Sequence, residues 1–509
     1  MAHKNNKSPL IVIGIDAGGP DFIKDWAEQG YLPTLSSVMD GGLWARTFGP
    51  ELVSEHGVWI SLFSGISRGE HGYHYFRQLK PGTYDLETVI GLDIDAPPFW
   101  SYLQGTDKKS LIIDAADTHL YPGLPGVQLS NWATHHNWDP DHYVVKSEPP
   151  EVYEDIREKF GSKQLTVENH NSTYEQDKEI HRTTLSHVKK KGELCRYLIP
   201  RNNSDLIVIV FAESHSGSHQ FWKYHPDNAG QGAPECELTN AIRDIYSAID
   251  KETQSILDMF DNPNVCILSS VGLEDEYPNS GLCDEFCKAL GYQASSEADG
   301  RMSFRPMDIA RKFIPESIRV ALSKNLSRER RERLLSDKFT NGTDWSKTVA
   351  FSLPVSYTSM IRVNLKGREP EGIVNPGEEY KTLVDKIVRD LKQLIDPVSG
   401  KPAVTKIDKT YEIFGPDTHP ALPDVFIEWK PGSFMERVVH PQAEITQKRP
   451  EFFRRSDHST HGFISLKGPS IKGLGNIADV QVLDVAPTLL NLLDEPIPPR
   501  MKGKLLHLL

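Results

Sequence analysis

The sequence predicts an α/β protein with a central, mostly parallel sheet sandwiched by helices. Three short apolar runs, in PLIVIGIDAGG, DLIVIVFAESH and NVCILSSVGL, are typical of buried strands, and each runs into a polar loop. Two longer segments, YEQDKEIHRTTLSHVKKKGELCRYLI and LTNAIRDIYSAIDKETQSILDMF, carry apolar residues at three- and four-residue spacing, which predicts helices. Strands that alternate with amphipathic helices indicate a sheet covered on both faces.

Two of the predicted strands are followed by carboxylates or imidazoles, which can bind a metal or transfer a proton. Asp16 follows the first strand. The second strand leads into FAESHSGSHQFW, which holds Glu213 and two histidines four residues apart, His215 and His219. In open α/β sheets, ligands bind beyond the carboxyl ends of the strands. We therefore expect these strand ends to converge on one site.

Length and charge exclude several classes of protein. The 509 residues, 38% hydrophobic and 25% charged, can bury a large core, so the chain is neither disordered nor fibrous. The formal net charge of -13 argues against nucleic-acid binding but permits a small anionic substrate at a local cationic site. The polar start MAHKNNKSP and the short apolar run after it predict no membrane span and no cleavage site, which favours a cytoplasmic protein. Five cysteines without zinc-ribbon spacing predict free thiols, and the oligomeric state is left open.

The order of the segments predicts a core that is interrupted by an insertion. Residues 1–290 form the first part of this core, with a variable, pocket-lining region at about 100–175. Residues 291–345 shift to a charged composition, in SSEADGRMSFRP and SKNLSRERRERLLSDK, which predicts a helical insertion or lid. Residues 346–509 form the second part of the core.

Six motifs occur in a fixed order along the whole chain: GIDAGGPDF, LPTLSSVMDGGLWA, SLFSGISRGEHGYHYF, VNLKGREPEGIV, HSTHGFISLKGPSI and DVAPTLLNLLDEPIPPRMKGKLL. Together they resemble the type I phosphodiesterase/nucleotide pyrophosphatase family of the alkaline phosphatase superfamily. The resemblance implies an alkaline phosphatase-like sheet with two metal ions, usually zinc, at the strand ends. It also implies that one metal holds an attacking Thr or Ser, and that the other helps to bind the phosphoryl group.

The resemblance places the family's nucleophile at or beside Glu55. The family has its Thr or Ser ten residues before the glycine of a TG pair and four before a tryptophan, and here these two residues are Gly65 and Trp59. Both counts reach Glu55, whereas Ser54 lies one residue earlier and is the alternative nucleophile. Asp16 matches the family's first carboxylate ligand.

One of the two implied metal centres keeps a full set of ligands. His215 stands at the position of the family's aspartate, whereas His219 and His458, four residues before Gly462, match the family's two histidines. With a possible carboxylate from Glu55, these three imidazoles can hold one divalent transition metal, and zinc is favoured over iron or manganese.

The other implied centre is degenerate. The family's Asp-His pair is replaced here by Ser270 and Val271, which leaves Asp16 and Glu55 at the remaining positions. Valine has no ligand atom and neutral serine is a poor ligand, so we expect this centre to be empty. Asp16 and Glu55 stay among the candidate metal ligands.

A single centre predicts a mononuclear, metal-dependent hydrolase of an anionic ester, such as a phosphodiester, a phosphonate or a sulfate ester. Glu55 would act as a general base or a fourth ligand, and Ser54 is the alternative catalytic residue. Two other classes stay open: a non-hydrolytic metalloenzyme of specialised metabolism (a lyase, an isomerase or an iron-dependent oxidase), and a catalytically silent binding protein. Four further polar residues are expected to contact the substrate or to support the ligands: His56, Glu213, Asp457 and His461.

Overall fold

The contacts of the computed structural model divide the chain into two compact units. The first comprises Met1–Ser67, Ile94–Asp275 and Arg454–Leu509, and the second comprises Arg68–Asp93 and Glu276–Phe453. The structure describes residues 8–54, 56–134, 143–164, 168–169, 171–226, 235–296, 328–430, 434–450, 453–472, 475–476 and 479–506.

The predicted insertion at 291–345 stays a prediction. Residues 297–327, the greater part of it, lie outside the described residues. Its last part contains helix α12 (Arg328–Asn341). Residues 276–453 belong to the second unit. Helix α12 and residues 342–453 after it are therefore part of that unit.

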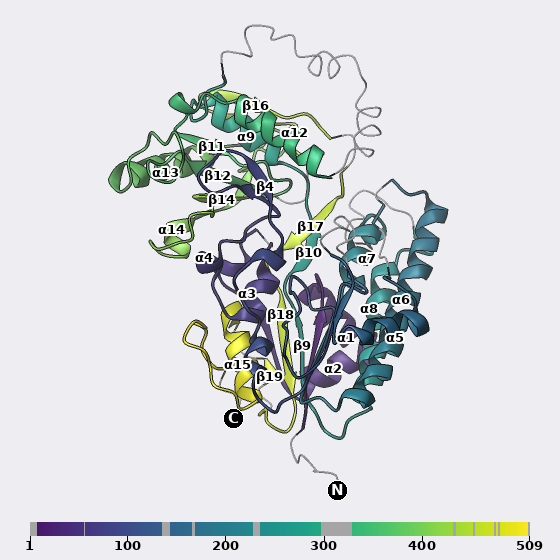
Figure 1. Ribbon diagram of the computed structural model, residues 1–509. Helices are drawn as coiled ribbons and strands as arrows, with labels where there is room; N and C mark the ends of the chain where they lie inside the picture. The colour runs from purple at the N-terminus through teal and green to yellow at the C-terminus, as the bar shows by residue number, and fades with distance from the viewer. Residues whose placement is uncertain are drawn as a thin grey trace. The chain divides into compact units, whose positions relative to one another are not determined.

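The first unit is built on a mostly parallel sheet, as predicted. Its strand order is β19-β2-β18-β9-β1-β8-β5-β6-β7, with β20 beside β2. Strand β1 pairs in parallel with both β8 and β9, so the three predicted strands lie side by side. Strand β18 lies on the other side of β9 (Figure 1). Only β18 and β7 run antiparallel to their neighbours among the described strands. The strands span Leu10–Ile15 (β1), Leu43–Phe48 (β2), Ser110–Ile113 (β5), Gly126–Ser130 (β6), Lys146–Glu148 (β7), Leu206–Phe211 (β8), Asn264–Ser269 (β9), Phe463–Lys467 (β18), Gly475–Asn476 (β19) and Val480–Gln481 (β20).

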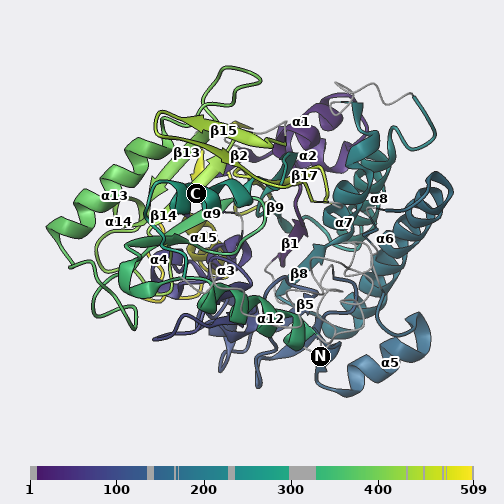
Figure 2. The same cartoon turned by 90° about the horizontal axis from the view of Figure 1, so that it is seen from above.

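Alternate side chains of the central strands enter two hydrophobic cores on opposite faces of this sheet. Ile11 and Ile13 pack with α1, α2, α6, α7 and α8, whereas Leu10 and Val12 pack with α3 and α15. Figure 2 shows α6, α7 and α8 gathered beside β8 and β1. The helices span Pro20–Glu28 (α1), Pro33–Asp40 (α2), Val58–Ser64 (α3), Tyr174–Asn202 (α6), Glu213–Phe221 (α7), Ala241–Leu257 (α8) and Val485–Leu492 (α15). The sheet is therefore covered on both faces, as the alternating pattern predicted.

The two helices that were predicted between the strands are α6 and α8. Helix α6 begins with a capping box, in which the Thr173 hydroxyl accepts the backbone N–H of Gln176 and the Gln176 side chain accepts that of Thr173. Helix α8 buries one apolar face against α6 and α7. Within the described residues, the helices are all too short or too polar to cross a membrane.

The second unit has a core of its own, between an antiparallel sheet and two helices. The strand order is β11-β12-β14-β13, and the core also includes side chains of α9, α13 and the hairpin β15-β16. These elements span Ser280–Ala289 (α9), Ala350–Ser352 (β11), Ser359–Val363 (β12), Glu378–Leu391 (α13), Val404–Lys409 (β13), Val425–Trp429 (β14), Arg437–His440 (β15) and Ala443–Thr446 (β16). A buried ion pair between Arg368 and Asp424, with an N–O distance of 2.6 Å, lies in this unit.

Candidate metal centre

Helix α7 carries two histidines on one face, directly beyond the end of β8. His215 and His219 are four residues apart, which places them one turn apart on the same side of the helix. The start of the helix is fixed by Ser214, whose hydroxyl lies 2.7 Å from the carbonyl oxygen of Asp16 and 3.0 Å from that of Phe211. The ends of β1 and β8 thereby position the helix that presents the two imidazoles.

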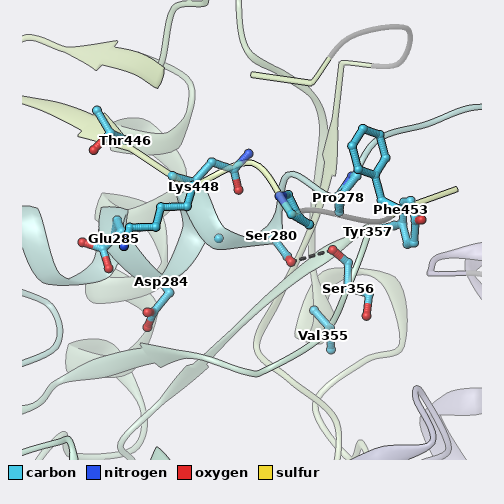
Figure 3. A pocket seen from close by; sticks show the side chains of 13 residues that line it. Pro278, Ser280, Asp284, Glu285, Val355, Ser356, Tyr357, Thr446, Lys448 and Phe453 are labelled. Carbon is cyan, nitrogen blue, oxygen red and sulfur yellow. Dashed lines mark hydrogen bonds between the residues drawn. The ribbon is translucent and has the colours of Figure 1, made fainter. Parts of the chain in front are cut away.

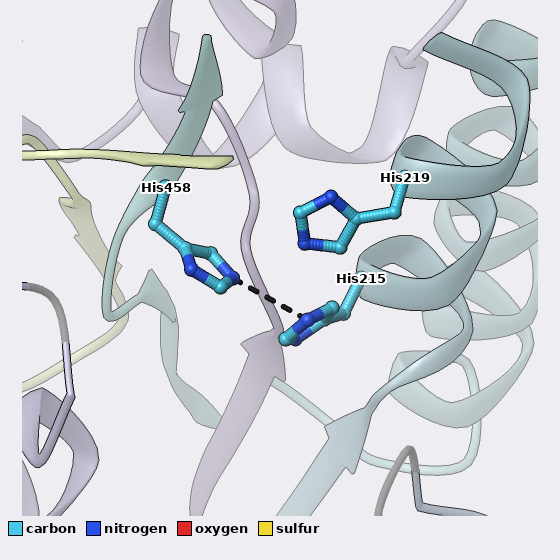
Figure 4. A group of neighbouring side chains, drawn as sticks. All are labelled: His215, His219 and His458. Carbon is cyan, nitrogen blue, oxygen red and sulfur yellow. Dashed lines mark hydrogen bonds between the residues drawn. The ribbon is translucent and has the colours of Figure 1, made fainter. Parts of the chain in front are cut away.

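A third histidine faces this helix from a two-stranded ribbon. Strand β17 (Ser456–Ser459) pairs antiparallel with β10 (Gly272–Asp275), and His458 stands across from Leu273. The Nε2 atoms of His458 and His215 are 3.3 Å apart, and one ligand atom from each histidine lies within 4.8 Å of the other two. Figure 4 shows the three rings facing one another, two from α7 and one from β17. We call His215, His219 and His458 the histidine cluster.

The spacing of one pair of histidines in the cluster, His215 and His458, fits a transition metal. Two nitrogen ligands at about 2.0–2.1 Å from a tetrahedral zinc ion lie about 3.3 Å apart. This matches the separation of the Nε2 atoms of His215 and His458. Neutral imidazole is a ligand that zinc, iron, copper and nickel all accept. Three neutral ligands leave the charge of a divalent cation uncompensated, so such a centre would attract an anion to an open position.

Each histidine of the cluster has an oxygen behind it, near Nδ1. In the order His215, His219 and His458, these oxygens are Asp16 Oδ2 at 3.1 Å, Ser456 Oγ at 2.9 Å and Asp457 Oδ1 at 3.0 Å. An acceptor at Nδ1 fixes the tautomer that leaves a lone pair on Nε2. The Asp16 carboxylate therefore favours a lone pair on Nε2 of His215, and the other two oxygens lie where they can support the same arrangement in His219 and His458.

Asp457 is a buried carboxylate in a strongly cationic environment. It is 2% exposed, and its Oδ1 lies 2.6 Å from Nη2 of Arg454. Burial alone would raise the pKa of Asp457, but Arg454, His458 and His56 together hold that pKa below its usual range. Asp457 is therefore ionised at neutral pH behind His458. The effect on its pKa also places the predicted residue His56 near this carboxylate.

Asp16 lies at the end of β1, as predicted, and contacts three other elements. In addition to the His215 contact, its Oδ1 accepts the indole N–H of Trp59, from α3, at 2.7 Å. Its backbone N–H donates to the carbonyl oxygen of Phe211 at 3.0 Å. Asp16 is 2% exposed and so joins β1, β8, α3 and α7.

A buried ion cluster lies at the start of α7. Lys191 Nζ is 3.1 Å from a carboxylate oxygen of Asp114 and 3.9 Å from one of Glu213, and it donates to the carbonyl oxygens of Ala133 at 2.9 Å and Val210 at 2.6 Å. Burial raises the pKa of Glu213, although Lys191 opposes this shift. The predicted residue Glu213 thus belongs to a group of charges that connects α7 with the ends of β5 and β8.

Ser54, the alternative nucleophile, lies in a turn that precedes α3. Glu55 is outside the described residues. Ser54 is 2% exposed and has a φ of 59°, a left-handed conformation that is uncommon for a residue other than glycine. Helix α3 connects this turn to the centre, because its Trp59 donates to Asp16. Ser54 and Glu55 both remain candidates.

At the positions of the family's Asp-His pair, Ser270 and Val271 offer no charged side chain. Val271 is 5% exposed and packs in the core on the α3 face, and Ser270 is 2% exposed. The neighbouring Ser269 hydroxyl donates to the carbonyl oxygen of Val271 at 2.7 Å and accepts the N–H of Gly18 at 2.8 Å. These contacts hold the loop after β9 against the loop after β1 without any metal ligand from Ser270 or Val271.

A cleft of about 340 Å³ lies beside the β10-β17 ribbon. It is lined by residues 19–22, by Trp222 just after α7, and by Leu273, Glu274, Asp275, Ser459 and His461. Leu273 is the cross-strand partner of His458, so the cleft and the cluster share the β10-β17 ribbon. The predicted residue His461 is exposed at this cleft.

The second unit contains a larger cavity, of about 810 Å³ (Figure 3). The start of α9 lines it, and there the Ser280 hydroxyl donates to the carbonyl oxygen of Ser356 at 2.5 Å. Asp284, Glu285 and Lys448 also line this cavity. Side chains of both charges favour no particular class of ligand.

Of the three residues that support the histidine cluster, the sequence pointed to Asp16 and Asp457 but not to Ser456. Ser456 lies two residues before His458, and this spacing places both side chains on the same face of a strand, which was the available signal. Lys191 and Asp114 gave no comparable signal, because they are distant in sequence and meet only in the folded chain.

Comparison with known proteins adds one match. A family model described as type I phosphodiesterase / nucleotide pyrophosphatase matches residues 10–463. The matched range begins with β1 and includes all three residues of the histidine cluster. No curated protein matches the sequence significantly.

Proposed function

Because the chain belongs to the type I phosphodiesterase/nucleotide pyrophosphatase family, a metal-dependent hydrolase family of the alkaline phosphatase superfamily, we propose that it hydrolyses an anionic ester with one metal ion. The observation that carries this proposal is the convergence of His215, His219 and His458. The ester is a phosphodiester, a phosphonate or a sulfate ester. We place the activity in the cytoplasm on the basis of the sequence alone.

A single metal ion is supported by the chemistry at the family's other centre. Val271 offers no ligand atom and packs in the core, and Ser270 is uncharged. Zinc is the proposed ion, since three protein ligands with an open position are typical of catalytic zinc sites, and iron or manganese is the alternative.

Some residues of the chain would hold the ion, and others would accept a proton. When bound, the metal supplies a Lewis acid and a water of lowered pKa. The histidine cluster would hold it through Nε2, with the imidazoles oriented from behind by Asp16, Ser456 and Asp457. Glu55 would accept the proton of the attacking water or act as a fourth ligand, and Ser54 is the alternative nucleophile.

The proposal is tested by turnover of the zinc-loaded protein with nitrophenyl esters of phosphate, of a phosphodiester, of a phosphonate and of sulfate. We expect hydrolysis of at least one ester, and loss of that activity in His219→Ala but not in the control His187→Ala, which replaces a histidine of α6. Glu55→Gln should lower the rate by about 10²–10⁴-fold, whereas Ser54→Ala should have a mild effect.

Two outcomes would contradict this proposal. Hydrolysis that persists in His219→Ala would mean that the histidine cluster is not the centre. A zinc-loaded protein that hydrolyses none of the esters would favour a non-hydrolytic metalloenzyme. If Ser54→Ala abolishes activity and Glu55→Gln does not, the nucleophile is Ser54.

A further inference from the structure

We propose that Asp16 is a positioning residue for His215 and does not bind the metal. This inference rests on the proposed single metal centre and assigns a role to the carboxylate that the family resemblance would make a ligand. It follows from which nitrogen of His215 the carboxylate contacts.

The geometry of the His215 imidazole shows whether Asp16 could bind the metal itself or could only position the ring. Asp16 Oδ2 lies 3.1 Å from Nδ1 of His215, whereas Nε2, on the other side of the ring, lies 3.3 Å from His458. A metal bonded to Nε2 at about 2.0–2.1 Å would lie about 7 Å from that oxygen, and at least about 5 Å from the other oxygen of the carboxylate. Carboxylate ligands of zinc lie at about 2.0–2.2 Å. Asp16 therefore cannot reach an ion that His215 holds.

The surroundings of Asp16 hold it in one orientation, which a positioning residue requires. Its Oδ1 accepts the indole N–H of Trp59 at 2.7 Å, and Trp59 stacks on Phe63 with ring centroids 4.9 Å apart. The indole lies over β1, where a Cβ on Gly14 would come within 3.0 Å of it. The backbone N–H of Asp16 donates to the carbonyl oxygen of Phe211, and its carbonyl oxygen accepts the hydroxyl of Ser214. Trp59, Asp16 and His215 thus form a buried chain of hydrogen bonds from α3 to α7.

The negative charge of Asp16 has a second effect on His215. A carboxylate that accepts the Nδ1 proton increases the basicity of Nε2, and loss of such a partner typically lowers metal affinity by about 10–100-fold. Asparagine keeps an acceptor oxygen but not the charge, and alanine keeps neither. Zinc affinity should therefore decrease in the order wild type, Asp16→Asn, Asp16→Ala.

The experiment measures zinc affinity of the full-length protein by competition with a chromophoric chelator, and the absorption spectrum of the cobalt(II)-loaded protein. We expect Asp16→Ala to lose about 10–100-fold in affinity, Asp16→Asn to lose less, and the cobalt bands to keep the number and intensity expected for unchanged ligands. Trp59→Phe should lower the affinity by less than Asp16→Ala. Asp25→Asn, an exposed acid on α1 that gives the same change in net charge, is the control.

The results separate this inference from the proposed function. Equal losses in Asp16→Asn and Asp16→Ala, with a changed cobalt spectrum, would mean that Asp16 is a ligand and would overturn the inference. Unchanged affinity in both variants would overturn it as well. Metal binding that survives His219→Ala would instead overturn the proposed centre. Far-ultraviolet circular dichroism of each metal-free variant shows whether the fold is retained.

Discussion

Replacing Lys191 by methionine should destabilise the first unit by about 3–5 kcal/mol. The Lys191 side chain is 0% exposed, and its Nζ lies 3.1 Å from Asp114 and 3.9 Å from Glu213. Methionine fills a similar volume, so the loss comes from the buried carboxylates of Asp114 and Glu213, which lose the ammonium group that faces both, and removal of one partner of such a pair costs about 3–5 kcal/mol. The carbonyl oxygens of Ala133 and Val210 also lose a donor, which places the expected loss near the upper end of this range.

The contribution of Lys191 should also depend on pH in a defined direction. Burial lowers the pKa of Lys191, but Glu213 and Asp114 outweigh this and raise it above the ordinary 10.5. A group whose pKa is raised by folding contributes stability that is fully present below its unfolded pKa and is lost as the pH rises through the folded pKa. The difference between wild type and Lys191→Met should therefore persist up to about pH 9 and diminish above about pH 10.5.

The assay is urea unfolding of the metal-free protein, followed by circular dichroism at several pH values. Lys189→Met, which removes an exposed lysine from the same helix, should change the unfolding midpoint little. A loss below about 1 kcal/mol in Lys191→Met would refute the reasoning that these charges depend on one another.

Three further predictions concern packing, a second ion pair and the thiols. Gly42→Ala should destabilise the protein by about 3 kcal/mol in urea unfolding, because its Cβ would lie 2.0 Å from the carbonyl oxygen of Leu466 on β18, and an unchanged midpoint would contradict this contact. Arg368→Met should cost about 3 kcal/mol in the same assay, since it removes the cation that contacts the buried Asp424 carboxylate and leaves that carboxylate only the N–H of Val363 and the hydroxyl of Tyr380 as direct partners. Burial alone would raise the pKa of Asp424, but Arg368 lowers it below 3.8, so the wild type should lose this contribution as the pH falls below that value. Iodoacetamide should alkylate only Cys236 in the native protein and all five cysteines after denaturation, as counted by mass spectrometry, because the other four thiols are buried.

The central strands and the helix that carries His215 and His219 could be predicted from the sequence, because their sequence patterns are local. The apolar runs at 10–15, 206–211 and 264–269 are strands by composition, and they are the adjacent strands β1, β8 and β9. The spacing of His215 and His219 indicated one helix face, which α7 provides. Each of these inferences needed only the period of a helix or a strand.

The environment of the centre could not be predicted in the same way. The family resemblance placed Asp16 among the candidate metal ligands, and its contact with Nδ1 of His215 depends on how α7 packs beyond β8. The contact of Ser456 with His219 depends on the β10-β17 ribbon. Such contacts join segments that are hundreds of residues apart, and no local pattern encodes them.

The proposed function requires that the histidine cluster bind one metal ion per chain. The most direct test is the metal content of the protein after saturation with zinc and removal of excess ion, measured by inductively coupled plasma mass spectrometry for the wild type, His219→Ala and the control His187→Ala. We expect one zinc per chain in the wild type and in His187→Ala, and almost none in His219→Ala, because two remaining imidazoles hold zinc poorly. Two tightly bound ions per chain, or one ion that His219→Ala retains, would contradict this expectation.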